Sequence, residues 1–221
     1  MQKYAIIVGG GTGIRFGSSI PKQFLELKGK PVLLHALQKF YAASESINII
    51  LVLPKEHIPK WENIRSYYKL PQYSLIEGGK ERFHSVKNGL KRVPDGNSLV
   101  AVHDAVRPLT PPDLINEIFN FAEKNGNAIP SIEVKDSMRR LNKENNYEPV
   151  DRKGHIMIQT PQCFYAKELK KAFEQDYHPE FTDEASIVES IGIIPHLTEG
   201  DPINIKITDK KDLALCQKLM V

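Results

Sequence analysis

Short apolar runs alternate with amphipathic segments along most of this chain. Runs rich in β-branched residues predict buried strands at 4–8, 47–53, 73–76, 98–102 and 128–132. Between them, apolar positions at helical spacing predict helices after residue 31, within 55–69, through 93 and over 111–125. Strands that alternate with helices are typical of a parallel sheet covered on both faces, where ligands bind at the carboxyl ends of the strands. We therefore expect an α/β fold.

The pattern changes after residue 132. Residues 133–154 are polar and turn-rich, with no helix and no core-facing stripe, and a turn is expected near Asn145. About twenty such residues are long for a loop inside a compact domain, so we expect a functional or interface role. Helices are predicted again at 167–175, 182–191 and 209–220, the second beginning with capping-type residues. We expect one domain over 1–221, with 133–154 as a protruding arm.

Composition limits the classes of function. The 221 residues are 41% hydrophobic and 26% charged, which is ordinary for a globular protein with one sizeable core. A net charge of +3 without a block of Lys and Arg argues against a nucleic-acid surface. Cys163 and Cys216 lack metal-ligand spacing and are expected to be buried thiols. With no signal peptide and no apolar run of the ~18 residues that a membrane span needs, we expect a cytoplasmic protein.

The first predicted strand leads into a glycine-rich segment that carries two cations, Arg15 and Lys22. Glycine tolerates positive φ and has no Cβ, so such a loop can fold its backbone N–H groups around an anion. The spacing fits neither the dinucleotide fingerprint nor a Walker loop. A tight strand-to-helix connection is the alternative interpretation. The two cations favour a site for a nucleotide triphosphate.

The pattern G-G-x-G-x-R-x-G at 10–17, followed by P-K-Q-F at 21–24, resembles the first loop of the sugar- and polyol-phosphate nucleotidylyltransferases. In particular it resembles the cytidylyltransferases that act on 2-C-methyl-D-erythritol 4-phosphate or on ribitol 5-phosphate, and the resemblance extends along nearly the whole chain. It implies a Rossmann-like nucleotidyltransferase sheet, mostly parallel, with helices on both faces and a β-arm. It also implies CTP as a substrate, catalytic roles for Arg15 and Lys22, and nucleotide binding by Gly9, Gly10, Gly11 and Gly13.

A second glycine element follows the strand at 73–76. Taken alone, it is explained by a glycine turn that caps a helix. The family places a G-G-x-x-R-x-x-S element over the cytosine and ribose, and the matching residues here are Gly79, Lys80, Arg82 and Ser85. His84 is expected to be an exposed helical residue without a role.

An acidic residue, Asp104, follows the strand at 98–102 and begins a D-A-x-R-P element. A carboxylate at this point can hold Mg²⁺, although an Asp–Arg pair that only fixes the loop is the alternative. The resemblance implies that Asp104 and Arg107 contact substrate and that Asp104 is near the metal. It also implies a third catalytic residue, Lys206, because the family's matching Lys contacts the α-phosphate of the nucleotide.

The family has a β-arm at 133–154 that crosses into a partner subunit. Residues 136–139 match its D-[TS]-x-[KR] element and 150–152 match its V-D-R element. The resemblance therefore implies a homodimer, in which a polyol phosphate is held by Arg107, Ser137, Arg152 and Thr160. An unsupported hairpin is marginal in water, so pairing between two arms is physically reasonable.

The motifs differ in the acceptor that they indicate. Gly9-Gly10 and D-A-V-R-P at 104–108 resemble the ribitol enzymes, whereas the arm and T-D-E-A-S at 182–186 resemble the methylerythritol enzymes. Because the arm should select the acceptor, we favour cytidylyl transfer to methylerythritol phosphate, giving 4-diphosphocytidyl-2-C-methyl-D-erythritol and pyrophosphate in non-mevalonate isoprenoid synthesis. The ribitol enzyme is one alternative. A non-catalytic nucleotide-binding module is another, and the presence of Arg15, Lys22 and Lys206 argues against it.

Overall fold

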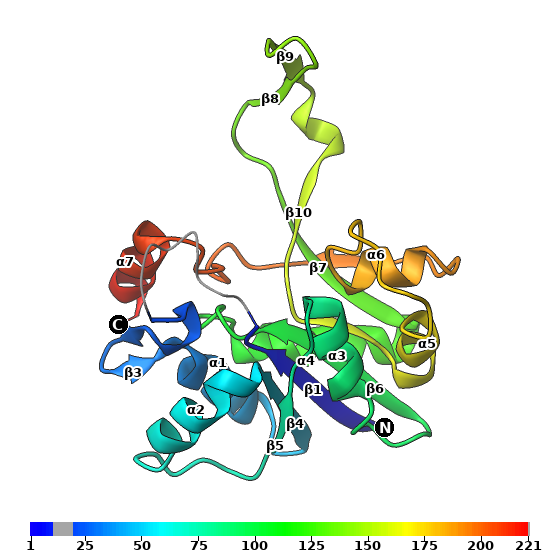
Figure 1. Cartoon of the computed structure of the whole chain (residues 1–221). Coiled ribbons are helices and arrows are strands. Elements are labelled where there is room, and N and C mark those ends of the chain that lie inside the picture. Colours follow the sequence, from blue (N-terminus) through cyan, green and yellow to red (C-terminus); the bar gives the residue numbers. More distant parts are fainter. Residues whose placement is uncertain (11–19, 221) are drawn as a thin grey trace.

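One central sheet organises the computed structural model, which describes residues 1–10 and 20–220 (Figure 1). The strands are hydrogen-bonded in the order β10-β7-β11-β6-β1-β4-β5, with β12 paired to β7. Their bounds are β1 (Gln2–Val8), β4 (Ile47–Leu53), β5 (Ser74–Glu77), β6 (Ser98–Asp104), β7 (Asn127–Glu133), β10 (Ile156–Ile158), β11 (Gln162–Tyr165) and β12 (Leu197–Glu199).

Four neighbouring strands, β6, β1, β4 and β5, run parallel, as the sequence predicted. Val8 at the end of β1 lies opposite Val52 of β4 and opposite Asp104 of β6. The backbone N–H groups of Gly9 and Gly78 both donate to carbonyls of β4, at 2.9 Å and 2.8 Å. This register brings the glycine loop, Asp104 and the second glycine element to one edge of the sheet.

Helices cover both faces of the sheet, which confirms the predicted layers. Ala5 and Ile7 of β1 face a core packed by α1 (Val32–Ala43), α2 (Ile58–Arg65) and α4 (Pro112–Asn125). Tyr4, Ile6 and Val8 face the other core, packed by α3 (Arg82–Leu90), α5 (Ala166–Ala172) and α6 (Glu184–Glu189). Since alternate residues of a strand point to opposite faces and both faces are buried, the strand reads as a continuous apolar run.

A small third cluster closes one edge of the domain. The hairpin of β2 (Glu26–Leu27) and β3 (Lys30–Pro31) lies here, with α7 (Lys210–Leu219). Leu27, Leu109, Ile207 and Cys216 are buried together. Three single 3₁₀ turns complete the described structure: η2 (Lys22–Phe24), η3 (Lys55–His57) and η4 (Arg152–Gly154).

Two features differ from the sequence predictions. β11 inserts antiparallel between β6 and β7, and neither it nor β12 was expected. Both strands are too short, at four and three residues, to show an alternation that a pattern can detect. The helix expected within 55–69 is divided, because η3 precedes α2 and the helix ends at Arg65.

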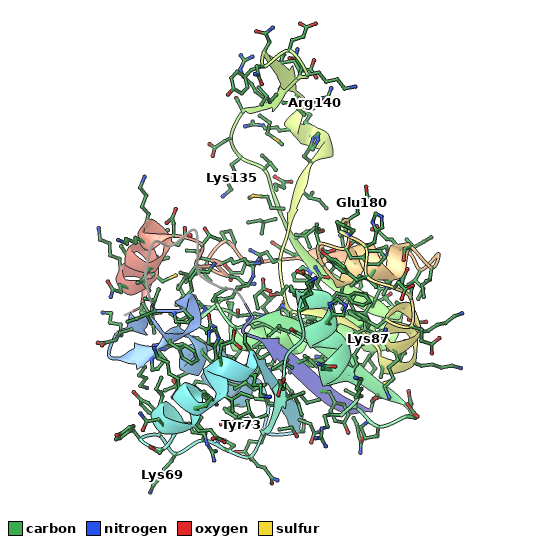
Figure 2. All side chains as sticks on the ribbon, viewed as in Figure 1. Lys69, Tyr73, Lys87, Lys135, Arg140 and Glu180 are labelled. Carbon is green, nitrogen blue, oxygen red and sulfur yellow. The ribbon has the colours of Figure 1, made fainter. Side chains whose placement is uncertain are left out.

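The segment 133–154 forms a hairpin of β8 (Met138–Leu141) and β9 (Tyr147–Val150) that projects away from the sheet (Figures 1 and 2). Its turn is closed by the side chain of Asn142, which accepts hydrogen bonds from the N–H groups of Glu144 and Asn146 at 3.0 Å and 2.9 Å. Asn145 adopts φ +60°, which agrees with the expected turn. Leu141 and Tyr147 are 52% and 68% exposed. The role of the arm in dimerisation stays a prediction.

The described ranges, 1–10 and 20–220, include no helix that is both long enough and apolar enough to span a membrane.

Candidate active site

A cavity of about 350 Å³ opens at the carboxyl ends of the parallel strands. It brings together most of the residues that the motifs indicated: Gly9, Gly10, Lys22, Gly79, Lys80, Arg82, Ser85, Asp104 and Lys206. These residues lie on separate loops that the strand register collects at one edge. Gly11, Gly13 and Arg15 belong to residues 11–19, outside the described part of the chain.

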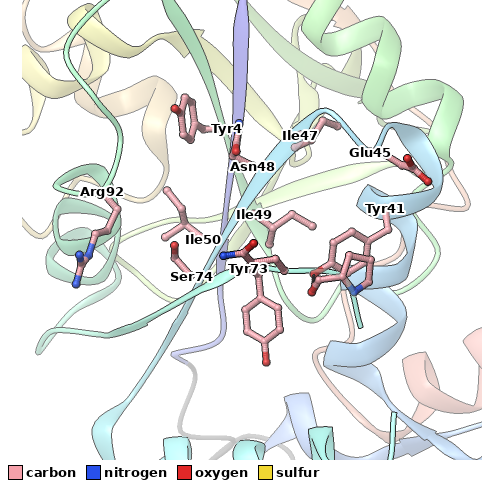
Figure 3. Close-up of a pocket in the computed structure, with 12 residues that line it drawn as sticks. Tyr4, Tyr41, Glu45, Ile47, Asn48, Ile49, Ile50, Tyr73, Ser74 and Arg92 are labelled. Atoms are coloured by element: carbon pink, nitrogen blue, oxygen red, sulfur yellow. Dashed lines mark hydrogen bonds between the residues drawn. The ribbon is translucent and has the colours of Figure 1, made fainter. Parts of the chain in front are cut away.

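A larger hollow, of about 660 Å³, lies at the opposite edge of the sheet (Figure 3). Its walls are built from the amino-terminal parts of β1, β4 and β5 with Tyr41 and Arg92, as the close-up shows. Ligands of parallel sheets bind at the carboxyl ends of the strands. The smaller cavity is therefore the candidate site, because it also holds the Lys and Arg side chains that the sequence motifs indicated.

The two glycines that begin the loop have different surroundings. A Cβ on Gly9 would lie 2.7 Å from Cδ2 of Leu53, so a side chain here requires Leu53 to move. A Cβ on Gly10 would have its nearest neighbour, Oγ of Ser85, at 3.9 Å. The carbonyl of Gly9 also accepts a hydrogen bond from Nε2 of Gln23 at 2.8 Å. Gln23, which the sequence did not indicate, thus fixes the start of the loop.

The second glycine element is held closed by Ser85. Its Oγ accepts a hydrogen bond from the N–H of Gly79 at 3.1 Å and donates to the carbonyl of Glu81 at 3.1 Å. A Cβ on Gly79 would collide with His84, so this position requires glycine. The expectation that His84 is exposed is wrong, because its ring packs 5.5 Å from the rings of Phe83 and of Tyr177. Its Nδ1 is buried without a hydrogen-bond partner among the described residues.

Asp104 is a buried carboxylate surrounded by three cations. Its Oδ2 lies 2.8 Å from Nζ of Lys206 and 3.5 Å from Nε of Arg107, and its Oδ1 lies 3.4 Å from Nε of Arg82. Burial favours the neutral acid, but the cations Arg82, Lys206 and Arg107 hold the pKa of Asp104 well below its usual range. Asp104 is therefore ionised at neutral pH and attracts cationic side chains to the floor of the cavity.

Arg82 is in turn held by Glu184, on α6. Its Nη1 and Nη2 donate to the two carboxylate oxygens of Glu184 at 2.6 Å and 2.9 Å, and Glu184 is fully buried. Burial opposes the charged form of Arg82, but the carboxylates of Glu184 and Asp104 raise its pKa further above the ordinary value. The sequence analysis interpreted residues 182–186 as a helix cap, and Asp183 does cap α6 by accepting from the N–H of Ser186 at 2.9 Å. The sequence analysis did not predict the ion pair that the next residue, Glu184, forms with Arg82.

Lys22 and Lys206 approach the cavity from different elements. Lys22 begins η2, and its Nζ donates to the carbonyl of Ile207 at 3.3 Å. Lys206 lies in a segment without regular secondary structure, between Asn204 and Ile207, both of which are fully buried. Both lysines line the first cavity, and Lys206 lines the smaller one as well.

A second, smaller cavity of about 210 Å³ adjoins the first and shares Arg82, Asp104 and Lys206 with it. Arg107 and Thr160 are among its other lining residues. Nη1 of Arg107 donates to the carbonyl of Asn204 at 2.7 Å, and Oγ1 of Thr160 accepts from the N–H of Asp104 at 3.2 Å. Their predicted contacts with a substrate phosphate stay predictions.

Ser137 and Arg152 are not brought to either cavity within this chain. Both lie on the arm, and Nη1 of Arg152 donates to the carbonyl of Lys135, also on the arm. Their predicted contact with an acceptor therefore requires the arm of another subunit, and it stays a prediction.

No group of three or more His, Cys, Asp or Glu side chains gathers into a metal site in the described part of the chain. Asp104 is the one carboxylate predicted as a ligand, and among described residues its Oδ1 has a single cationic contact, with Arg82. Mg²⁺ in phosphate-transfer sites typically takes one or two carboxylates, while phosphate oxygens and water complete its shell. Asp104 alone is therefore an incomplete metal site, and a magnesium ion that arrives with a nucleotide stays a prediction.

His103, Thr110 and Asn204 were also missed. All three are fully buried, and His103 directly precedes Asp104 in β6. Burial lowers the pKa of His103 to about 3, although the neighbouring Asp104 opposes the shift. A polar residue inside an apolar strand, as His103 is in β6, was the available sequence signal.

Comparisons with known proteins agree with this geometry. Residues 4–221 match a family model described as 2-C-methyl-D-erythritol 4-phosphate cytidylyltransferase. A protein of that name from Bacteroides fragilis is 43% identical over 221 residues, with both chains covered completely, and one from Azobacteroides pseudotrichonymphae is 44% identical with 99% of each covered. The crystal structure of the Francisella tularensis protein of that name has a TM-score of 0.82 and 30% identity, covering 99% of each chain.

Proposed function

The chain belongs to the 2-C-methyl-D-erythritol 4-phosphate cytidylyltransferase family, and we propose that it transfers the cytidylyl group of CTP to 2-C-methyl-D-erythritol 4-phosphate. The products are 4-diphosphocytidyl-2-C-methyl-D-erythritol and pyrophosphate, in non-mevalonate isoprenoid synthesis. The observation that carries the proposal is the cluster of Arg82, Asp104 and Lys206, which forms the wall shared by the two adjoining cavities. Such an arrangement suits two anionic substrates that must meet at one phosphorus atom.

In the proposed reaction, a phosphate oxygen of the acceptor attacks the α-phosphorus of CTP in line, and pyrophosphate leaves. Both substrates are anions, so the enzyme has to position them and neutralise charge. A phosphate monoester is largely ionised at pH 7, so no general base is needed. This agrees with a site that is rich in Lys and Arg.

We base the catalytic assignments on the family resemblance and, for Lys206 and Lys22, also on their place in the cavities. Lys206 contacts Asp104 at the boundary of the two cavities and is assigned to the α-phosphate. Lys22 enters from the glycine-loop side and is assigned, with Arg15, to the transition state and the leaving pyrophosphate. The nucleotide is assigned to the first cavity, against Gly9, Gly10, Gly79, Lys80, Arg82 and Ser85, with Gly11 and Gly13 also in the loop. Mg²⁺, bound with CTP and held by Asp104, would neutralise part of the triphosphate charge.

The acceptor is assigned to the second cavity, between Arg107 and Thr160. Ser137 and Arg152 complete its site in our proposal, contributed by the arm of a partner subunit in a homodimer. The exposed Leu141, Tyr147 and Met157 support this, because a hairpin with apolar side chains in water gains stability when another chain covers them. We further propose a cytoplasmic enzyme that requires neither nucleic acid nor membrane.

A ribitol-phosphate enzyme is the second candidate, favoured by Gly9-Gly10 and D-A-V-R-P at 104–108. A side-by-side pyrophosphate-release assay with CTP and each acceptor tests the choice. We expect a higher kcat/KM with the methylerythritol phosphate, because the arm elements at 136–139 and 150–152, which should select the acceptor, resemble those of the methylerythritol enzymes. A preference for ribitol phosphate would overturn the acceptor but keep the cytidylyl transfer. CTP binding without pyrophosphate release from either acceptor would indicate a non-catalytic module.

A further inference from the structure

Lys206 lies in a segment, 204–208, that has no regular secondary structure. Two anchors hold this segment: the N–H of Ile207 donates to the carbonyl of Val106 at 2.9 Å, and the side chain of Asn204 is completely buried. The 2.8 Å contact between Lys206 and Asp104 therefore depends on where these anchors place the backbone.

Hydrogen bonds involve every polar group of Asn204. Its carbonyl accepts from Nη1 of Arg107 at 2.7 Å, and its N–H donates to the carbonyl of Asp201 at 2.9 Å. Its Nδ2 donates to the carbonyl of Thr160 at 2.8 Å and to Oε1 of Gln159 at 3.3 Å. Since Nδ2 is thereby oriented, Oδ1 faces Oγ1 of Thr110 at 2.8 Å and accepts its proton.

His103 joins Thr110 to Thr160, on the opposite side of the ring. Nε2 of His103 lies 3.2 Å from Oγ1 of Thr110, and Nδ1 lies 3.0 Å from Oγ1 of Thr160. Oγ1 of Thr160 also accepts from the backbone N–H of Asp104 at 3.2 Å, so its own proton is available to Nδ1. A neutral His103 then carries its proton on Nε2 and donates it to Thr110, with the carbonyl of Arg107 as a second acceptor.

If the chain of hydrogen bonds ran in the opposite direction, buried polar groups would be left unpaired. With the proton on Nδ1, Thr110 would donate to Nε2, and Oδ1 of Asn204 would lose its donor among the described residues. Thr110 has a further acceptor, the carbonyl of Arg107, but at 3.1 Å it is farther than Oδ1 of Asn204. Because an unpaired buried polar group is costly, one direction is strongly preferred.

We propose that His103 is a positioning residue: as the Nε2–H tautomer it relays one directed chain of hydrogen bonds from the backbone of Asp104 through Thr160 and Thr110 to Asn204, and so fixes Lys206 at Asp104. The inference rests on the proposed function, in which Lys206 contacts the α-phosphate. It explains how the segment 204–208, which has no regular secondary structure, can hold the catalytic side chain of Lys206 in place.

Thr110→Val tests the chain without changing His103, because it removes the hydroxyl but nearly preserves the shape of the side chain. Thr110→Ser is the matched control, since it keeps the hydroxyl. Displacement of a catalytic group by about 1 Å costs up to ~10²-fold in rate, so we expect Thr110→Val to lower kcat by ~10- to 100-fold with little change in the KM for CTP. Thr110→Ser should keep most of kcat. Equal kcat values for the two folded variants would overturn the proposal.

Two further measurements separate positioning from a purely structural role. In a Lys206→Ala background, Thr110→Val should add little further loss of kcat, because its effect acts through Lys206; a full additional loss would refute that route. ¹⁵N NMR of the wild-type protein at pH 7 should show His103 as the Nε2–H tautomer, and an Nδ1–H tautomer would refute the chain. The NMR result does not depend on activity, whereas a wild-type protein without pyrophosphate release would count against the proposed function itself.

Discussion

The ion pair between Arg82 and Glu184 predicts a large effect of burial on stability, and the chain contains its own control. Nη1 of Arg82 contacts Oε1 of Glu184 at 2.6 Å, and Glu184 is fully buried. On the arm, Nη2 of Arg140 contacts Oε1 of Glu148 at 2.5 Å, but these side chains are 74% and 42% exposed. The residue types and the distances match closely, so a comparison of Glu184→Gln with Glu148→Gln measures mainly the effect of burial, provided that light scattering shows the same oligomeric state for both variants.

The magnitude follows from the groups that each change leaves behind. Glutamine at 184 keeps one acceptor oxygen but turns an NH₂ group towards Arg82, which is left as a partly buried cation. Removing one partner of a buried pair costs ~3–5 kcal/mol, and Arg82 keeps its contact with Asp104 and is 30% exposed, so we expect ~3 kcal/mol. For a chain of this length, 1 kcal/mol shifts Tm by about 2–4 °C, which gives a decrease of ~6–12 °C. Glu148→Gln should cost only ~0–1 kcal/mol.

Thermal unfolding of both variants, followed by circular dichroism at the same protein concentration, checks this. Urea unfolding gives the free energies separately, provided that the m-value is unchanged. Equal Tm values for the two variants would refute the reasoning, because the buried charge would then contribute no more than the exposed one.

Three other predictions concern the remaining features. Lys22→Ala should lower kcat by ~10²–10³ with little change in the KM for CTP in a pyrophosphate-release assay; a normal kcat with a weakened KM would contradict its catalytic role. Burial raises the pKa of the Cys163 thiol, and it raises the pKa of Cys216 to about 11. Neither buried thiol should therefore react with a disulfide reagent until the protein is unfolded, and rapid labelling of the native protein would contradict this. Deleting residues 143–147 should weaken dimerisation and raise the KM for the acceptor but not for CTP. A wild-type protein that is monomeric in light scattering and fully active would rule out the proposed role of the arm.

The parallel half of the fold could be predicted because its signals are local. β1, β4 and β6 are apolar runs buried on both faces, whereas β5 at the edge of the sheet is half-buried. The residues after each of these strands lie at the carboxyl edge by the geometry of parallel sheets. This placed Gly9, Gly79 and Asp104 together before any contact was known. β11 could not be predicted, since its four residues pair antiparallel with β6 across about sixty positions of sequence.

The ion pair between Arg82 and Glu184 could not be predicted either, because its partners lie far apart in the sequence. Arg82 and Glu184 are separated by 102 positions, and Glu184 begins a helix whose acidic first turn is explained equally well by capping. A pattern identifies the face that a residue occupies, but it does not identify the charge on the element packed against that face. Lys206 stood out as a charged residue inside a β-branched run, but its role came from the family motif, because its own segment has neither strand nor helix geometry.

The glycines at 9 and 10 show how a departure from a family motif can be weighed physically. A Cβ at residue 9 would lie 2.7 Å from Leu53, whereas residue 10 has space for one, with its nearest neighbour at 3.9 Å. Glycine at 9 is therefore matched to the leucine at the end of β4, and an alanine here would require Leu53 to shift or to be smaller. Both residues lie on the first cavity, assigned to CTP, and neither lines the second. The feature that this chain shares with the ribitol enzymes therefore concerns packing under the nucleotide loop, and it carries little weight in the choice of acceptor.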